Sequence, residues 1–469
     1  MTDLHHLTAA ELSAAYAAGT LSPVDATAAA LARIEAWEPH VNAMYLVHRE
    51  SALAGARASE ARWRAGKALS ALDGVPVTIK ENIASRGDPA PIGTKANEGL
   101  PPAANDAPPT ARVREAGCVI LGKTTMPDYG MLSSGLSSLH GLTRNPWRLD
   151  RNTSGSSSGS GAAAAAGYGP LHLGTDIGGS VRLPATHCGI FALKPTLGRV
   201  PVHPPYIGRI VGPMTRTVLD AALLMNLVTR SDPRDFMSLP YHPVDYARAL
   251  DGADAGWAKG LRIGFLADMK TGLPVNAEVA AAAKAAAAAL ASAGAKVDAM
   301  ESFLTPALLD GMCRFFEARS YNDYAALTPE RKAMVMPFIA EWCTWRAKDF
   351  SGRDVMDAYN TYVAMREAAV AACEPYDYVI SPTSPILPYE AELPCPGNDP
   401  RDALPHIAFT VAYNMSEQPA ASINWTASAD GLPIGVQVIG HRFDDAGVLR
   451  LSRLLEQLRP AQRAWPEPA

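Results

Sequence analysis

Along the chain, segments with the period of an amphipathic helix alternate with short, continuously apolar runs typical of buried strands. The first helix is predicted to start at the capping-box pattern from Thr8 to Glu11, and the second at Ser22, which is followed by proline. Further helices are predicted over 50–66, 110–116, 217–229, 275–294 and 444–458. Strands are predicted over 72–79, 118–121, 261–266, 378–381 and 434–439, with another at Lys296. Strands that alternate with helices in this way indicate an α/β fold.

Two kinds of segment depart from this alternation. Proline- and glycine-rich loops are predicted over 90–109, 200–212 and 382–400, and a further loop over 231–242. The segment 301–375 is helical in pattern throughout and rich in aromatic residues. We expect a helical insertion there, whose aromatic side chains either form its own core or line a substrate pocket.

Composition narrows the class of protein. The chain has 469 residues, of which 48% are hydrophobic and 19% charged, and its net charge is −5. We expect one domain over 1–469 with its catalytic core over 70–200, because α/β enzymes often run large as one unit. The mixed charges favour neither nucleic acid nor a membrane surface as a partner. No leader or membrane span is visible, and the six cysteines form no CxxC pair, which favours a cytoplasmic protein with reduced thiols.

The stretch 152–183 carries the strongest candidate chemistry. It has two loops of small residues, 154–161 and 174–180, on either side of an alanine run that favours a helix. Glycine lets backbone N–H groups approach a ligand closely, and several N–H groups aimed at one point can stabilise an oxyanion. Ser180, directly after two glycines, is placed to attack a carbonyl held by those groups. The alternative is a flexible Gly/Ser linker, which the alanine run and the apolar residues that follow disfavour.

The residues around this stretch resemble a known family. The sequence Gly-Thr-Asp-Ile-Gly-Gly-Ser-Val-Arg at 174–182 is similar to the motif of the amidase signature family of serine hydrolases. Ser156 and Ser180 are 24 residues apart, which is the family's spacing, and an apolar strand upstream ends in Lys80. Further matches lie at 122–124, 144–147, 189–196 and 431–440. The resemblance covers nearly the whole chain and is weakest over 235–375.

The resemblance implies a fold, a mechanism and a set of site residues. The fold would be a central mixed sheet covered by helices on both faces, with a helical insertion. Ser180 would be the nucleophile, Ser156 a bridging serine in a cis peptide, and Lys80 the base, with neither cofactor nor metal. The oxyanion hole would be formed by the N–H groups of Ile177, Gly178, Gly179 and Ser180.

The first loop departs from the family pattern, because Ser154 and Ser158 stand where glycine is usual. A residue other than glycine costs about 1 kcal/mol or more wherever the backbone needs a positive φ. The reacting residues are unchanged, so we expect altered fine geometry rather than lost activity. Asp176 and Arg182 belong to the second motif, and we interpret them as scaffold.

Three other patterns suggest different chemistry. Residues 117–124 match the Walker A pattern, but their middle is strand-like, which disfavours nucleotide binding. Ser157 is the centre of a nucleophile-elbow pattern, but the residues before it are polar rather than an apolar strand. His172 or His187 could complete a Ser/His/Asp triad with Ser180, although both fit structural roles more simply.

We expect hydrolysis of amide-type C–N bonds, with aryl or hydrophobic amides, anilides or carbamates (urethanes) as substrates. The alternatives are the glutaminase (A-type) subunit of a tRNA-dependent amidotransferase, a nucleotide-binding protein and a catalytically inactive scaffold. A small-molecule substrate and a monomer or homodimer are expected. The candidate pocket residues, chosen for apolar and polarizable surfaces, are Met126, Tyr129, Met131, Phe315, Phe316, Trp342, Tyr413 and Trp425.

Overall fold

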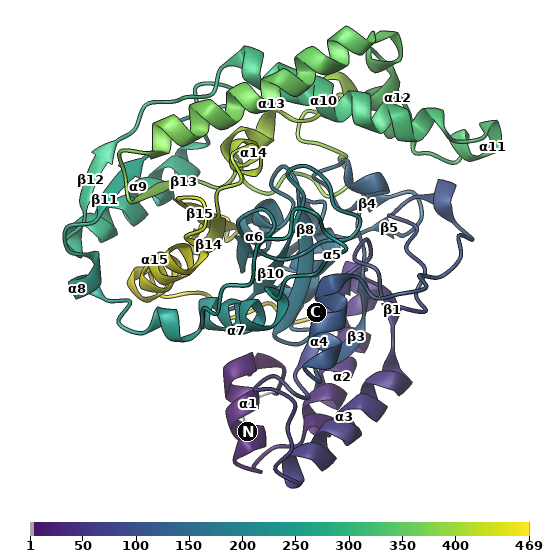
Figure 1. Cartoon of the computed structure of the whole chain (residues 1–469), viewed down its shortest axis with the longest axis vertical. Coiled ribbons are helices and arrows are strands. Elements are labelled where there is room, and N and C mark those ends of the chain that lie inside the picture. Colours follow the sequence, from purple (N-terminus) through teal and green to yellow (C-terminus); the bar gives the residue numbers. More distant parts are fainter. Residues whose placement is uncertain (1–3, 469) are drawn as a thin grey trace.

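One large mixed sheet runs through the molecule. The computed structural model describes residues 4–468 and is drawn in Figure 1. Over these residues, eleven strands lie in the order β1-β3-β2-β8-β10-β9-β14-β15-β13-β11-β12. Their bounds are β1 Met44–Val47, β2 Pro76–Lys80, β3 Val119–Thr124, β8 Leu171–Asp176, β9 Phe191–Lys194, β10 Ile210–Thr215, β11 Arg262–Phe265, β12 Lys296–Ala299, β13 Tyr378–Pro382, β14 Ala420–Ala427 and β15 Pro433–Gly440. Two small ribbons pair β4 (Leu136–Ser137) with β5 (Gly141–Leu142) and β6 (Arg144–Asn145) with β7 (Arg148–Asn152).

Strand directions change along the sheet. β2 runs parallel to both of its neighbours, β3 and β8, and all five of its residues are buried. The other parallel group is β13-β11-β12, whereas the strands from β8 to β13 in the sheet order pair antiparallel. A parallel strand that is covered on both faces typically has a nearly continuous apolar sequence. The predicted mixed sheet is therefore confirmed, and Lys80 ends a strand that is buried along its whole length.

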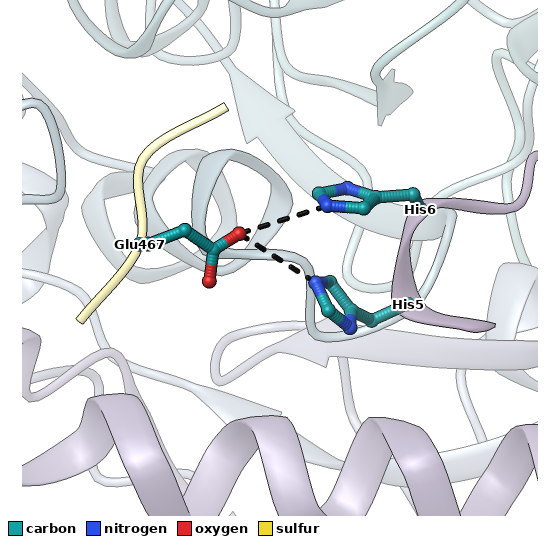
Figure 2. A group of neighbouring side chains, drawn as sticks. All are labelled: His5, His6 and Glu467. Carbon is teal, nitrogen blue, oxygen red and sulfur yellow. Dashed lines mark ion pairs between the residues drawn. The ribbon is translucent and has the colours of Figure 1, made fainter. Parts of the chain in front are cut away.

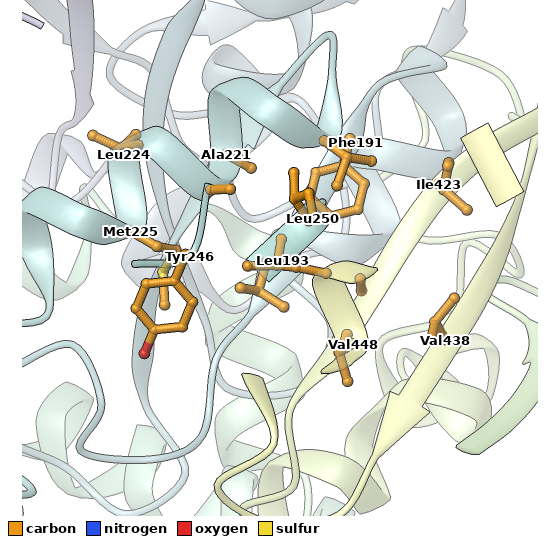
Figure 3. Close-up of a cluster of buried hydrophobic side chains, with 14 of the residues drawn as sticks. Phe191, Leu193, Ala221, Leu224, Met225, Tyr246, Leu250, Ile423, Val438 and Val448 are labelled. Carbon is orange, nitrogen blue, oxygen red and sulfur yellow. The ribbon is translucent and has the colours of Figure 1, made fainter. Parts of the chain in front are cut away.

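Helices cover both faces of this sheet, as predicted. One face packs against α1, α4, α7, α9 and α15, and the other against α2, α3, α5 and α6. In β9, Phe191 and Leu193 belong to the core on the first of these faces and Ala192 to the core on the other face, because successive side chains of a strand point to opposite faces. Figure 3 shows part of the first core, between α7, β9 and the C-terminal strands. These helices are α1 Ala9–Ala17, α2 Pro23–Val41, α3 Arg49–Arg64, α4 Pro108–Glu115, α5 Ser158–Ala166, α6 Arg182–Cys188, α7 Val218–Val228, α9 Ala277–Ser292 and α15 Asp445–Leu458, and a short α8 covers Ala255–Ala258.

The segment 301–375 forms a layer of helices along one side of the molecule, coloured green in Figure 1. It consists of α10 Pro306–Ala325, α11 Pro329–Lys332, α12 Pro337–Thr344 and α13 Gly352–Cys373. Its apolar side chains share one core with α14 (Ala408–Met415) and with the sheet residues Val379 and Ile439. The helical pattern is confirmed. That this layer is an insertion within a single domain over 1–469 stays a prediction, and residues 1–3 and 469 lie outside the described residues. Over 4–468, no helix combines the length and apolar character needed to cross a membrane.

The structure adds elements that the sequence pattern did not predict. These include β1, β8, β9, β10, β14, α6 and α14. β10 was hidden because it contains Gly212 and Pro213, which are typical of turns. Proline is tolerated there because β9 pairs with β10 only at Met214 and Thr215. The strand expected over 72–79 begins only at Pro76, since the residues before it form a turn.

The two serines at the family's usual glycine positions differ in conformation. Ser154 has a φ of 58°, in the left-handed region, where an L-residue costs about 1 kcal/mol or more. Its Oγ is buried and has no hydrogen-bond partner among the described residues. Ser158 is the first residue of α5 and has helical geometry. The cost expected at one or both positions therefore falls on Ser154.

Replacing Ser154 by glycine should raise the free energy of unfolding by about 1 kcal/mol. The change removes the left-handed penalty and a buried unpaired hydroxyl, which outweigh the added flexibility of glycine in the unfolded chain. Ser158→Gly is the matched control: it also removes a buried unpaired hydroxyl but places glycine in a helix, which costs about 0.5–1 kcal/mol, so it should give no comparable increase in the free energy of unfolding. Urea unfolding of both variants measures the difference, and equal shifts in the two would contradict it.

Candidate active site

The end of β2 places the Lys80 amine among three hydroxyl groups. Lys80 is fully buried, and its Nζ lies 2.9 Å from Ser156 Oγ, 3.0 Å from Ser157 Oγ and 2.9 Å from Thr175 Oγ1. The two serines come from the loop before α5, where the Gly155–Ser156 peptide bond is cis, and Thr175 comes from β8. The structure thus brings together two of the three predicted catalytic residues, which are far apart in the sequence.

Hydrogen-bond partners decide where each hydroxyl proton points. Ser157 Oγ accepts from the Thr175 N–H (3.2 Å) and donates to the Thr175 carbonyl oxygen (3.1 Å). Thr175 Oγ1 lies 3.2 and 3.4 Å from the two side-chain amide atoms of Asn82. Within residues 4–468, Ser156 Oγ has only Lys80 Nζ as a partner. An ammonium group donates to all three hydroxyls. A neutral amine has two N–H donors and one lone pair, so one hydroxyl then donates to it, and Ser156 Oγ is free to do so because Lys80 Nζ is its one partner within residues 4–468.

Burial sets the charge of this amine. Removal from water disfavours the ammonium form and holds the pKa of Lys80 well below its ordinary value of 10.5. The nearby Arg209 guanidinium acts in the same direction, whereas the carboxylates of Asp176 and Glu81 oppose it. Glu81 accepts a hydrogen bond from His140 Nε2 at 2.7 Å. The site therefore favours a neutral lysine, which is the form that can accept a proton.

A buried ion pair fixes the loop that carries Ser180. Asp176 at the end of β8 and Arg182 at the start of α6 are joined by two bonds of 3.0 Å, and both side chains are fully enclosed. Arg182 also donates to Asn414 Oδ1 (2.6 Å) and Gln437 Oε1 (2.8 Å). Burial alone would raise the pKa of Asp176, but the guanidinium holds it well below its usual range. The pair agrees with the scaffold role expected for these two residues.

Ser180 follows a turn that requires glycine. Gly179 has a φ of +132°, and a Cβ there would lie 2.5 Å from Thr410 Oγ1 and 2.8 Å from Leu183 Cδ1. Ser180 itself is partly exposed, and its carbonyl oxygen accepts from the Ser157 N–H at 3.1 Å. That bond joins the two small-residue loops. Within the described residues, the Ser180 hydroxyl makes no hydrogen bond, which leaves it open toward a ligand.

Three of the four predicted oxyanion-hole amides are free. Within residues 4–468, the N–H groups of Ile177, Gly178 and Ser180 have no acceptor. The Gly179 N–H instead donates to Asp176 Oδ1 at 2.8 Å. The expected contribution of the Gly179 N–H to the oxyanion hole is therefore corrected, because this N–H already donates to the Asp176 carboxylate.

A narrow, mostly apolar pocket opens beside Ser180. Gly130 lines it, and a Cβ on Gly130 would lie 3.2 Å from Ser156 Oγ, so Ser156 lies next to the same space. The lining comes from the loop after β3, the Ser180 loop, the helical layer and the segment before α14. The lining residues are Gly130, Met131, Leu132, Ser133, Ile177, Gly178, Ser180, Leu183, Phe316, Arg319, Ser320, Trp342, Leu404 and Ile407.

The predicted pocket residues divide into two groups. Met131, Phe316 and Trp342 lie in the lining. The others lie outside it: Met126 and Tyr413 are buried, Tyr129 packs near Leu132, Phe315 packs against Tyr359 and Tyr362, and Trp425 belongs to the core of the sheet. An aromatic residue in the sequence gives no sign of which side of its helix faces the pocket. Sequence reasoning also missed Arg319, because a charged position in an amphipathic helix is ordinarily solvated.

The alternative chemistries do not assemble in this structure. Residues 119–124 form the strand β3, and Lys123 Nζ donates to the Ile83 carbonyl and to Ser85 Oγ, so the Walker-like segment forms no phosphate loop. His172 bonds to Thr78 Oγ1 at 2.7 Å, and burial lowers its pKa to about 3. Burial likewise lowers the pKa of His187 to about 3. Neither imidazole has the basicity that a triad needs near neutral pH.

The nucleophile-elbow interpretation of Ser157 also fails, although for a different reason than expected. A strand, β7, does precede this loop, where the polar sequence predicted none. The Ser157 hydroxyl is nevertheless buried and bonded to the Thr175 carbonyl oxygen, so it is not presented to a ligand.

One cluster brings three metal-ligand atoms together near the two ends of the described chain (Figure 2). Glu467 Oε1 lies 3.7 Å from His5 Nε2 and 3.6 Å from His6 Nε2. The other Glu467 oxygen accepts from the Arg33 guanidinium, and Arg216 Nη1 lies 3.4 Å from His6 Nδ1. Two guanidinium groups beside the cluster disfavour a divalent cation. We therefore assign it to holding the two ends of the described chain together.

Comparison with known proteins identifies the family. The Amidase family model matches residues 25–449. The A-type subunit of the glutamyl-tRNA(Gln) amidotransferase of Chloroflexus aggregans is 36% identical over 96% of either chain, and an acylamidase of Rhodococcus erythropolis is 33% identical over 98% of this chain and 96% of that protein. The crystal structure of a bacterial aryl acylamidase from the amidase signature family matches with a TM-score of 0.89 and 28% identity, over 97% of this chain and 96% of that one. This chain belongs to the amidase signature family and is an amidohydrolase.

Proposed function

We propose that this protein hydrolyses aryl or otherwise apolar amides, anilides or carbamates, using Ser180 as nucleophile, Ser156 as bridge and Lys80 as base. The observation that carries the proposal is the buried Lys80 amine, 2.9 Å from Ser156 Oγ, beside a pocket into which Ser180 opens. A serine hydroxyl is a weak nucleophile until a base removes its proton. Lys80 supplies that base through Ser156.

In the first step, Ser180 Oγ forms a bond to the carbonyl carbon of the substrate. The Ser180 proton passes to Ser156, whose own proton passes to the Lys80 amine. The carbonyl oxygen becomes an oxyanion, which the free N–H groups of Ile177, Gly178 and Ser180 stabilise.

In the second step, the C–N bond breaks and the leaving nitrogen takes a proton from Ser156, which Lys80 restores. The acyl group stays on Ser180 as an ester. Water then attacks this ester and passes a proton through Ser156 to Lys80. The ester bond breaks and Ser180 Oγ takes the proton back through Ser156, which releases the acid (a carbonic acid monoester when the amine has left a carbamate) and regenerates the Ser180 hydroxyl and the neutral Lys80 amine.

The pocket supports an apolar substrate. Phe316 and Trp342 offer aromatic surfaces, and Met131 a polarizable thioether, around the partly exposed Ser180. The Rhodococcus erythropolis acylamidase aligns with 98% of this chain, and the bacterial aryl acylamidase shares its fold over 97% of it. An anilide or aryl carbamate would place its ring against these side chains.

The second candidate is a glutaminase subunit that releases ammonia for a tRNA-bound amino acid. The 36% identity to the A-type subunit of the Chloroflexus aggregans amidotransferase favours it. That activity needs partner subunits and produces ammonia from glutamine. It is therefore separable from hydrolysis of anilides by the isolated chain.

We expect the isolated protein to release aniline from anilides and aryl carbamates, and Ser180→Ala to lower kcat by at least about a thousandfold, because it removes the nucleophile. Chromatography of the released amine, beside ammonia assays with glutamine and matched primary amides, measures this. Ser158→Gly is the control for a change in the same small-residue region. The glutaminase would be established instead if glutamine were the only compound hydrolysed, or if ammonia were released from glutamine only after partner subunits were added.

The pH dependence of kcat/KM should follow Lys80. Its amine acts as base only when neutral, so activity should be low below the pKa of Lys80, rise with pH, and level off above it. Because burial lowers that pKa, the midpoint should lie well below 10.5. Lys80→Ala should abolish the rise together with most of the activity.

Two other buried lysines provide the controls for this profile. Burial lowers the pKa of Lys123 to about 8 and that of Lys194 to about 7, so either could produce a limb in the same range. Lys123→Met and Lys194→Met should keep the midpoint of the wild-type protein. The assignment of Lys80 would be refuted if the pH midpoint of kcat/KM disappeared in Lys123→Met or Lys194→Met but persisted in the residual activity of Lys80→Ala.

A further inference from the structure

The pocket beside Ser180 contains one cationic side chain that the mechanism does not use. Arg319 lies on α10 and lines the pocket together with Ser180 and the apolar residues. Its side chain is partly exposed. Within residues 4–468 it makes no hydrogen bond and no ion pair, and its guanidinium lies 4.8 Å from the centre of the Tyr206 ring. The face of an aromatic ring orients a guanidinium but leaves its N–H donors unsatisfied.

The carboxylates near Arg319 are engaged elsewhere or exposed. Glu317, two residues earlier, is bonded by Arg346 at 2.5 and 3.2 Å. Asp176 is committed to Arg182. Asp323, one turn further along α10, is exposed and forms no ion pair within the described residues. Arg319 therefore brings an unmatched positive charge to the pocket.

A second cation strengthens this imbalance. Arg209 is partly buried, donates to the Asn82 carbonyl oxygen at 3.1 Å, and lowers the pKa of Lys80. Arg319 in turn lowers the pKa of Arg209, after burial. The two guanidinium groups thus act on the same region, and an anionic group brought there by a ligand would relieve their repulsion.

We propose that Arg319 is a specificity-determining residue that binds the carboxylate of an amide substrate whose remaining part is apolar. This rests on the proposed hydrolysis by Ser180. A guanidinium binds a carboxylate through two parallel N–H···O bonds, which fixes orientation as well as charge. Phe316, Trp342 and Met131 would enclose the apolar part while the carboxylate meets Arg319. The substrate class is therefore an amide that bears both a hydrophobic group and a negative charge.

Three anilides of closely matched size test the proposal. Hexananilide is neutral, adipic acid monoanilide carries a carboxylate on the acyl arm, and N-hexanoyl-meta-aminobenzoate carries one on the ring. The wild-type kcat/KM should be at least about tenfold higher for one of the charged amides than for hexananilide, because only a charged amide can form charge-assisted hydrogen bonds with Arg319. That preference should shrink as ionic strength rises.

Variants assign the preference to Arg319. Arg319→Met should lower the ratio of charged to neutral kcat/KM at least about tenfold, and Arg319→Lys should retain part of it, since it keeps the charge but loses the two-pronged geometry. Arg353→Met removes an exposed cation of the same helical layer, whose ion pair within residues 4–468 is with Asp357, and should leave the ratio unchanged. If Arg319→Met lowers all three rates equally, Arg319 has only a structural role and the proposal is overturned, while the hydrolase assignment stands.

A binding measurement separates this proposal from the proposed function. Calorimetry with the Ser180→Ala protein should show tighter binding of one charged anilide than of hexananilide, and that advantage should disappear in Ser180→Ala/Arg319→Met. If the wild type hydrolyses none of the three but this difference in binding is present, the hydrolase substrate is wrong and the carboxylate site remains. If neither charged anilide binds better than the neutral one, the carboxylate site is refuted whatever the activity.

Discussion

The exclusion of water from the Lys80 amine is the constraint on which the rest of the site depends. A lysine in water is an ammonium ion and cannot act as a base near neutral pH. Here the amine ends a strand that lies between two parallel neighbours, and its three close partners are neutral hydroxyls rather than carboxylates. A carboxylate at that distance would favour the charged form. The sheet supplies the burial, and the choice of hydroxyl partners keeps the lysine neutral.

The nearest negative charges are kept away from Lys80 by other partners. Asp176 is held by Arg182, whose remaining donors bind Thr410, Asn414 and Gln437. A buried ion pair stabilises only when such additional hydrogen bonds satisfy it, because desolvation of two charges is costly. The same network fixes the turn before Ser180 and consumes the Gly179 amide. One set of contacts therefore positions Ser180, the proposed nucleophile, and engages the Asp176 carboxylate so that it does not pair with Lys80, the proposed base.

Chemistry and specificity come from different parts of the fold. The proposed reacting groups belong to the sheet and to the two small-residue loops. Much of the rest of the pocket wall comes from the helical layer, through Phe316, Arg319 and Trp342, and from the segment before α14, through Leu404 and Ile407. The family resemblance is weakest across this layer, so members with the same reacting residues can differ in their pockets. For this reason family membership establishes amide hydrolysis but not the substrate.

The sequence by itself determined the class of fold and the family and indicated which residues to propose as the reacting ones, because strand and helix periods and short glycine-serine motifs are local properties. It also pointed to Ser154 and Ser158 as positions of altered geometry, and the structure assigned the positive φ to Ser154. Only the tertiary structure decided that Ser156 faces Lys80, that Gly179 donates to Asp176, and that Phe316 rather than Phe315 lines the pocket. Arg319 could likewise be identified only from the tertiary structure. That it forms no ion pair within residues 4–468 depends on the side chains of all the elements packed around it. Burial, the direction of a side chain and the competition for a hydrogen bond depend on contacts between distant segments, and no local pattern encodes them.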